Sequence, residues 1–312
     1  MSQRFKADVA LAACMFMWGA TFVVVQDALA YASVFAFLSA RFLLAAAVML
    51  AIYWRTVRRL DRAEILAGSI IGVFLFSGYI FQTVALKFTT PSKAAFLNGS
   101  SAVLVPVLLA VFWRTRINRW AWAGAIVAMF GLYFVAVPPS GLGNLNIGDL
   151  LSIGSAVMFA FHILAVAHYS TRHSVAGLTF LQIALTAALA TIALPIVAAA
   201  RWEAPRFEIT SALIFATVVT ALGCTVLGFS AQLWAQKHTS ANHTAILFTL
   251  KPVFAALTSY VVLHERLSRR TLAGAALIFA AILLAELKGP APAPAPMDST
   301  GPIAIRNVGP GL

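Results

Sequence analysis

The amino-acid sequence predicts an all-α integral membrane protein with ten transmembrane helices, arranged as two inverted five-helix repeats around a central cavity. The chain of 312 residues is 61% hydrophobic and 10% charged, whereas soluble domains hold roughly 25% charged residues. Apolar stretches of about 20 residues, the length with which a helix crosses a bilayer, recur along the chain. The two halves of the chain also share sequence patterns at equivalent places.

Ten apolar stretches lie between polar breaks, and each is predicted to form one membrane-spanning helix. They cover residues 8–28, 33–54, 63–86, 93–113, 119–138, 149–169, 175–198, 209–236, 241–263 and 270–287. The longest polar break among them, "PPSGLGNLNIGD", separates five spans from five. The expected organisation is a first repeat at 1–138, a linker loop at 139–148, a second repeat at 149–288 and a disordered Pro-rich tail at 289–312.

The repeat is visible in two pairs of aligned segments. "QTVALKFTTPSKAAFL" from Gln82 aligns with "QLWAQKHTSANHTAIL" from Gln232, and "RINRWAWAGA" aligns with "RLSRRTLAGA". Pro106 and Pro252, which are both expected to break their helices, pair when the first half carries four extra residues. Because each repeat has an odd number of spans, the second must enter the membrane from the opposite side. Inverted repeats are a recurrent plan of secondary transporters, whose substrate site lies near the midplane between the copies.

The net charge of +12 arises from Lys and Arg residues in short loops between the apolar stretches. We therefore interpret it as a topology signal and expect no nucleic-acid partner. With a cytoplasmic N-terminus, cytoplasmic segments hold 13 of these residues and outer segments hold seven. This bias, which comes from the first half, predicts that both termini are cytoplasmic.

Signatures of pumps and enzymes do not occur in the sequence. There is no G-x-x-x-x-G-K-[ST] loop to cradle phosphates. The ten acidic residues and six histidines show neither a catalytic pair nor metal-ligand spacing. We expect no catalytic residue, no metal and no cofactor, and hence no enzyme. Cys14 and Cys224 lie inside apolar stretches and predict no disulfide framework.

Lys251 is the first candidate for a substrate-binding residue. It lies ten or more residues from either end of its predicted span, which places its Cα about 15 Å from both membrane surfaces. Pro252 removes a backbone donor and pushes away the carbonyl of Phe248, so a free acceptor is expected beside the cation. Ionisable residues within membranes usually mark transport routes, so Lys251 is expected to line the cavity and attract a carboxylate. Alternatively, it donates to carbonyls across a helix interface or loses its proton.

Equivalent positions in the two halves supply further candidates. Trp18 and Thr21 share a helix face in the first span, and their counterparts Phe159 and His162 share the equivalent face of the sixth. These faces could form aromatic walls for a planar side chain, although ordinary helix packing explains the pattern equally well. His162 could also carry protons or serve as a hydrogen-bonded packing residue.

Tyr79 and Gln82 lie three positions apart on the third span, opposite Phe229 and Gln232 on the eighth. A buried glutamine must find hydrogen-bond partners, and a substrate could supply them. Hydrogen bonding between helices would explain the repeated glutamines as well.

Two other spans also carry polar residues that could reach the same site. Asn98 and Ser101 share a face of the fourth span and could bind a substrate amino group. Arg41 lies eight residues inside the second span. We expect it to be a structural anchor that is hydrogen-bonded to neighbouring carbonyls.

Four motifs occur in order along the chain: "MWGATF" (17–22), "ARF" (40–42), "ALKFTTPSKAAFL" (85–97) and "KPVFAALTSYVVLHERLSRRTLAGA" (251–275). In this order and with this duplication, they resemble the drug/metabolite transporter superfamily in its ten-helix EamA-type branch. The resemblance spans residues 8–288 and implies two inverted halves around a central cavity, in the bacterial inner membrane. It further implies export of small metabolites, often amino acids, and aromatic amino-acid exporters are the members that the chain resembles most.

Two positions depart from the family pattern. Many members have Glu before the proline where this chain has Lys251, and the loop residue Glu265 has Thr115 opposite it in the first half. The first departure leaves the charge preference of the substrate open.

Together these features predict a secondary transporter that exports small metabolites, preferably aromatic amino acids, by alternating access. Because no span has a midplane carboxylate, facilitated export is the simpler hypothesis than proton coupling. Two alternatives stay open, namely an antiporter of anionic metabolites such as nucleotide sugars and a pore-forming channel. The expected partners are the small-molecule substrate and the lipid bilayer, and the oligomeric state is left open, a monomer included.

Overall fold

The structure, a computed structural model, describes residues 3–89, 91–262 and 268–287. Within these ranges the chain is helical, with one isolated bridge between Ala32 and Phe207. The predicted all-α class is therefore confirmed. The predicted tail at 289–312 and the loop residue Glu265 lie outside the described residues.

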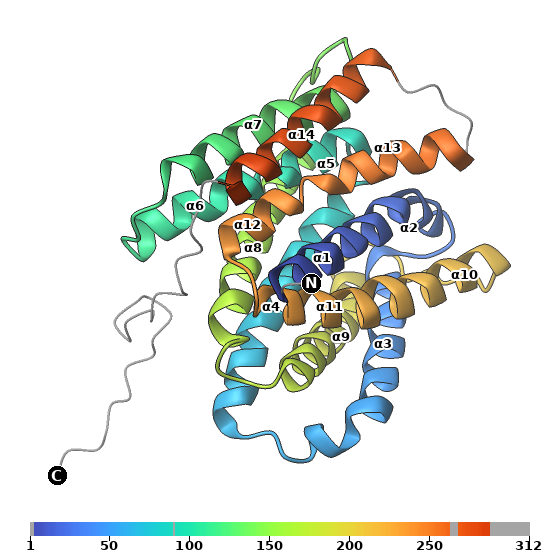
Figure 1. The fold of residues 1–312 in the computed structure, drawn as a ribbon. Helices are drawn as coiled ribbons and strands as arrows, with labels where there is room; N and C mark the ends of the chain where they lie inside the picture. Colours follow the sequence, from blue (N-terminus) through green and yellow to red (C-terminus); the bar gives the residue numbers. More distant parts are fainter. Residues whose placement is uncertain (1–2, 90, 263–267, 288–312) are drawn as a thin grey trace.

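The helices follow one another with short connections, and their course is drawn in Figure 1. Their bounds are α1 (Gln3–Ala20), α2 (Phe22–Ala28), α3 (Val34–Val57), α4 (Arg62–Ala85), α5 (Pro91–Gly99), α6 (Ser101–Phe112), α7 (Arg119–Ala136), α8 (Ile147–Tyr169), α9 (Val175–Ala199), α10 (Ser211–Val219), the π-helix η1 (Thr220–Leu227), α11 (Gly228–Gln236), α12 (Ala241–Leu247), α13 (Leu250–Val262) and α14 (Arg269–Leu287).

Six helical segments within the described residues are long and apolar enough to cross a membrane. They are α3, α4, α7, α8, α9 and the continuous segment Ser211–Gln236, which joins α10, η1 and α11. A shorter apolar segment covers Phe96–Phe112. The chain is thus an integral multi-pass membrane protein. The other predicted spans fall on α1 with α2, on α12 with α13 and on α14, so the number ten stays a prediction.

Helices α4, α8 and α9 each begin at a residue whose side chain caps the first turn. Asp61 accepts a hydrogen bond from the backbone N–H of Glu64 at 2.7 Å and begins α4. Asn146 and Asp149 form a reciprocal capping box at the start of α8. Ser174 accepts from the N–H of Gly177 and begins α9. Each cap satisfies amide groups that the first helical turn leaves without partners.

The helix interruptions precede the two prolines and do not lie at them. The helix breaks between α12 and α13, and Pro252 is in the first turn of α13. Here the expectation of a free carbonyl at Phe248 was wrong, because that carbonyl accepts the N–H of Lys251 at 3.2 Å. Pro106 lies inside α6, and the interruption expected there is displaced to Ser100, between α5 and α6.

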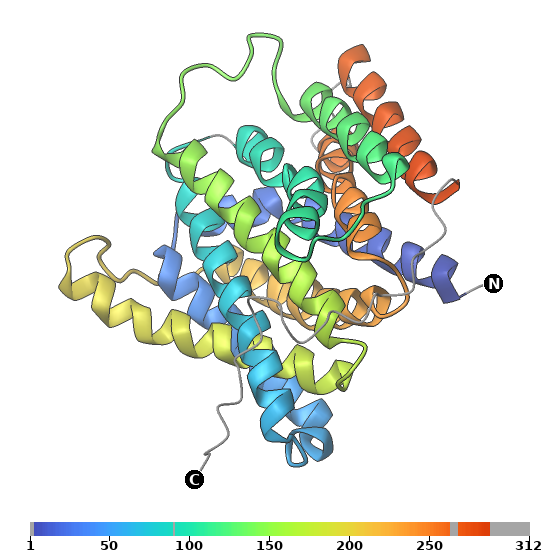
Figure 2. The same ribbon diagram turned by 90° about the vertical axis from the view of Figure 1, so that its left-hand side faces the viewer.

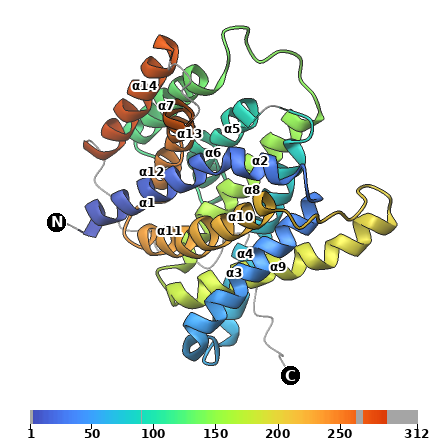
Figure 3. The ribbon, with the colours of Figure 1, turned by 90° about the vertical axis from the view of Figure 1, so that its right-hand side faces the viewer.

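The principal helix contacts join the two halves of the chain. Figure 1 shows α7 beside α14, and they stay adjacent in the turned view of Figure 2. A Cβ atom on Gly131 of α7 would lie 2.7 Å from the carbonyl oxygen of Gly274 on α14, so glycine permits this backbone contact. Likewise α3 packs on α9, and α4 packs on α8 and α9. Figure 3 shows α1 between α11 and α13, both of which it contacts.

The main apolar core forms where α1, α3, α4 and α9 meet the α10–α11 segment. Outward-facing helix surfaces carry large apolar side chains that stay exposed, among them Phe130, Ile196 and Phe215. Apolar surface of this extent is typical of a face covered by lipid.

Candidate functional site

Lys251 lies at the start of α13 with its ammonium among three aromatic rings. Its Nζ is 5.5 Å from the ring centroid of Trp18, 5.8 Å from that of Phe159 and 5.9 Å from that of Phe248. All three distances are within the range of a cation–π interaction. We call these four residues the aromatic cage. No hydrogen bond from Nζ to a carbonyl is found among the described residues, and the lysine keeps partial exposure.

Two further rings extend the cage. Tyr79 of α4 meets Phe159 edge to face, with 5.6 Å between centroids. Phe229 of α11 packs 5.2 Å from Trp18 and 6.3 Å from Tyr79. The predicted residues Trp18, Tyr79, Phe159 and Lys251 are therefore brought together, by helices from both halves of the chain.

Glycines allow α1 to approach its neighbours at this place. A Cβ atom on Gly19 would lie 2.4 Å from the carbonyl oxygen of Lys251, and one on Gly228 would lie 3.1 Å from Nε1 of Trp18. Only a residue without a side chain permits the first of these contacts. The backbone of α13 consequently touches α1 beside the cage.

The π-helix holds the indole of Trp18. Nε1 of Trp18 donates to the carbonyl of Cys224 at 2.9 Å. Cys224 lies within η1, where i to i+5 hydrogen bonding redirects backbone carbonyls. The prediction of one regular span at 209–236 missed this feature, since apolar periodicity does not distinguish a π-helix from an α-helix.

Arg41 of α3 contacts Tyr79, one of the two rings that extend the cage. Its Nε donates to Oγ1 of Thr225 at 2.9 Å, and its Nη2 donates to the hydroxyl of Tyr79 at 3.2 Å. The guanidinium also lies over the Tyr79 ring, 4.9 Å from the centroid. We expected Arg41 to donate hydrogen bonds to carbonyls. Its partners are the hydroxyls of Thr225 and Tyr79, and Tyr79 is one of the two rings that extend the cage. Arg41 is buried, with 4% of its surface exposed.

Thr21 and His162 bond to protein groups next to the cage. Oγ1 of Thr21 donates to the carbonyl of Met17 at 2.8 Å and lies 3.1 Å from the sulfur of Cys224. Nε2 of the buried His162 is 2.8 Å from Oε1 of Gln182, and its ring packs edge to face on Phe229.

The remaining predicted site residues differ in their surroundings. Gln82 is partly exposed on α4. Gln232 is buried, its Nε2 donates to Oε1 of Gln236 at 2.7 Å, and its own Oε1 has no hydrogen-bond partner in the described part of the chain. Nδ2 of Asn98 donates to Ser155 of α8 at 2.8 Å. Ser101 is buried at the start of α6.

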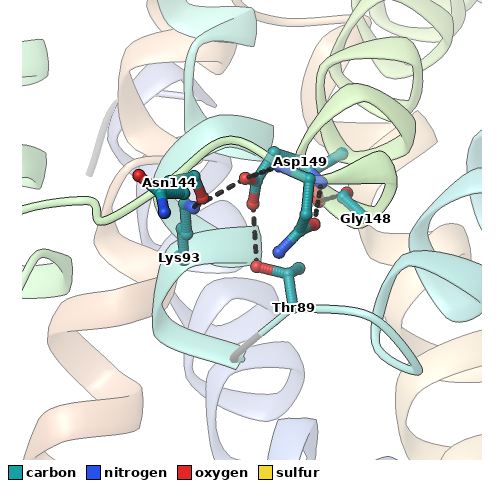
Figure 4. A network of polar contacts seen from close by, with 7 residues as sticks. Thr89, Lys93, Asn144, Gly148 and Asp149 are labelled. Atoms are coloured by element: carbon teal, nitrogen blue, oxygen red, sulfur yellow. Dashed lines mark hydrogen bonds and ion pairs between the residues drawn. The ribbon is translucent and has the colours of Figure 1, made fainter.

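A polar network at the start of α8 fastens this helix to α5 (Figure 4). Nζ of Lys93 lies 2.6 Å from Oδ2 of Asp149 and donates to the carbonyl of Asn144 at 3.0 Å. Thr89 donates to Oδ1 of Asp149 at 2.8 Å. Figure 4 shows these side chains converging on the carboxylate.

A hydrogen bond between His243 and Asp8 occupies the equivalent place in the other half. Nε2 of His243 lies 3.0 Å from Oδ1 of Asp8. In the repeat alignment Asp8 is opposite Asp149, and His243 is opposite Lys93. The two halves therefore use matching positions for matching contacts.

Comparison with known proteins adds a family and several relatives. The sequence model of the EamA-like transporter family matches the chain twice, at residues 5–137 and 146–287. The chain is similar to an uncharacterized transporter of Archaeoglobus fulgidus, 32% identical over 286 residues that cover 92% of this chain and 87% of the relative. It is also similar to the uncharacterized transporter YvbV of Bacillus subtilis, 26% identical over 92% of this chain and 94% of the relative.

The fold has a counterpart among solved structures. One protein crystal structure matches with a TM-score of 0.74 at 19% identity, covering 90% of this chain and 96% of that chain. At this identity the likeness extends to the fold alone.

Proposed function

Because the chain belongs to the EamA-like transporter family, as its motifs predicted, we propose that it exports small metabolites by alternating access. Aromatic amino acids are the proposed substrates, and the bacterial inner membrane is the proposed location. The transport function itself rests on the family and on relatives that are named transporters.

The aromatic cage carries the substrate proposal. A carboxylate that reached Nζ of Lys251 would form a charge-assisted hydrogen bond inside a medium of low dielectric constant. A planar side chain could then stack against Trp18 or Phe159, which already flank the ammonium. The partial exposure of Lys251 and Phe159 is consistent with access by a ligand.

Three observations support two inverted repeats of five spans each, at 1–138 and 149–288 with the linker at 139–148. The family model matches each half separately. The contacts of α1 with α11 and α13 correspond to those of α8 with α4 and with α5–α6 when the halves are exchanged. The paired contacts Asp149–Lys93 and Asp8–His243 obey the same exchange. This arrangement would give ten spans with both termini on the same side of the membrane, and the Lys and Arg bias of the loops favours the cytoplasmic side.

Proteoliposomes test the proposed function. Vesicles with the wild-type protein should exchange L-phenylalanine in counterflow and saturate, which a pore-forming channel would not do. Collapse of the pH gradient should leave the flux unchanged if export is facilitated.

Lys251→Met should raise the apparent KM at least tenfold, as expected from losing a charged hydrogen bond worth about 1.5–3 kcal/mol. An unchanged apparent KM in this variant would contradict the proposed site.

An antiporter of anionic metabolites is the second candidate. It is favoured by one observation, namely that Lys251 and Arg41, both cationic, lie on the same aromatic cluster. Exchange of a nucleotide sugar for its nucleoside phosphate would identify this activity.

A further inference from the structure

We infer that the cage selects its ligand by net negative charge, so that planar carboxylates without an amino group bind more tightly than the corresponding amino acids. This inference rests on the proposed function and deepens it, because it ranks the ligands of the same site by charge, with ring-bearing organic anions above aromatic amino acids.

Lys251 provides the first positive charge. The rings around its ammonium present electron-rich faces, which attract a cation but carry no net charge. The positive potential of the lysine therefore remains available to a ligand.

Arg41 provides the second positive charge. Its two hydrogen-bond acceptors, Thr225 and Tyr79, are hydroxyl groups and leave the guanidinium charge uncompensated. Tyr79 lies between Arg41 and Phe159, so this charge acts on the cage from its far side.

The acidic side chains that the structure describes lie away from these two cations. Those with partners are Asp8 with His243, Asp61 with the amide of Glu64, Glu64 with the amide of Ser174, Asp149 with Lys93, Glu203 with Lys87, and Glu208 with Arg206. Asp27 and Glu208 are exposed. Among the side chains that the structure describes, no carboxylate contacts Arg41 or Lys251.

A ligand carboxylate would thus neutralise one of two like charges, whereas an ammonium group on the same ligand would add a third. Charge repulsion at short range inside protein is only weakly screened by salt. A zwitterion should consequently gain less binding energy than the matching anion.

Three ligands with the same phenyl ring and two-carbon chain test this inference on the purified wild-type protein at pH 7. They are 3-phenylpropionate, an anion, L-phenylalanine, a zwitterion, and phenethylamine, a cation. Calorimetry should give a Kd for 3-phenylpropionate about tenfold below that for L-phenylalanine, and no binding of phenethylamine. Tighter binding of L-phenylalanine, or binding of phenethylamine, would contradict the inference alone. Failure of all three ligands to bind would contradict the proposed function as well.

Charge variants show whether the cage is the source of the preference. Lys251→Met should reduce the preference for the anion about tenfold. Lys87→Met removes the same charge from an exposed loop site, where it pairs with Glu203, and should leave the preference unchanged. Equal effects of the two variants would show that the preference comes from overall charge and would overturn the assignment.

Flux measurements give an independent test. Transport of a net anion moves charge, so a potassium diffusion potential imposed with valinomycin should accelerate or slow 3-phenylpropionate flux according to its sign. Flux of L-phenylalanine should not respond. A 3-phenylpropionate flux that ignores the potential would mean that the ligand is not carried as an anion.

Discussion

Lys251 directs its ammonium at the indole ring of Trp18, with 5.5 Å between Nζ and the ring centroid. These residues come from α13 and α1, which belong to different halves of the chain. The contact therefore depends on how the halves meet, and a transporter that changes the relation of its halves would alter the surroundings of Lys251.

Replacement of Trp18 should weaken ligand binding. Trp18→Ala removes a cage wall and a cation–π partner, and we expect the Kd for an aromatic carboxylate to rise about tenfold. Trp18→Phe keeps an aromatic face but loses the hydrogen bond to Cys224, so we expect a rise below about threefold. Calorimetry measures both values. Equal losses in the two variants would assign the role to the hydrogen bond and not to the ring.

Gly19→Ala should destabilise the protein. The new Cβ would lie 2.4 Å from the carbonyl oxygen of Lys251, and relief of such a clash costs typically about 1–3 kcal/mol. We expect a lower midpoint of thermal unfolding in detergent. Gly223→Ala is the matched control on a membrane-spanning helix, because its Cβ would meet open space. A midpoint that fell equally in both variants would show that the contact of α1 with α13 is not the cause.

Asp149→Asn should destabilise the protein by about 3 kcal/mol, because it leaves the buried ammonium of Lys93 without its carboxylate. The double variant with Lys93→Met should lose less than the sum of the single losses, which a thermodynamic cycle from unfolding in mixed detergents would reveal. Additive losses would mean that the pair contributes no coupling.

The equivalent contact, between Asp8 of α1 and His243 of α12, should contribute less to stability. Asp8→Asn should cost less than Asp149→Asn, since the side chain of Asp8 is 15% exposed against 1% for Asp149. The same unfolding measurement compares the two. A larger loss at Asp8 would contradict the view that burial sets the strength of these contacts.

Much of the helical architecture could be predicted from apolar run length alone. The predicted span at 63–86 corresponds to α4, and that at 149–169 corresponds to α8. Alignment of the two repeats pointed to Trp18 and Phe159, because positions related by a repeat tend to face one another at the interface between the copies.

Other features of the site lie beyond what the sequence could reveal. The π-helix η1 accepts a hydrogen bond from Trp18 across the fold, at the carbonyl of Cys224, and apolar periodicity reveals neither the π-helix nor this contact. The third cage ring, Phe248, precedes Lys251 by three residues across the interruption between α12 and α13, and it was not among the site residues predicted from the sequence. The partners of Arg41 come from α4 and η1, and no local pattern pairs such distant segments.

The location of a bound ligand tests the aromatic cage most directly. A crystal structure with 3-(4-bromophenyl)propionate would place the bromine by its anomalous signal. We predict that the carboxylate lies within hydrogen-bond distance of Nζ of Lys251 and that the ring packs against Trp18 or Phe159. A ligand bound at another place, with Lys251 still enclosed by its three rings, would contradict the proposed site.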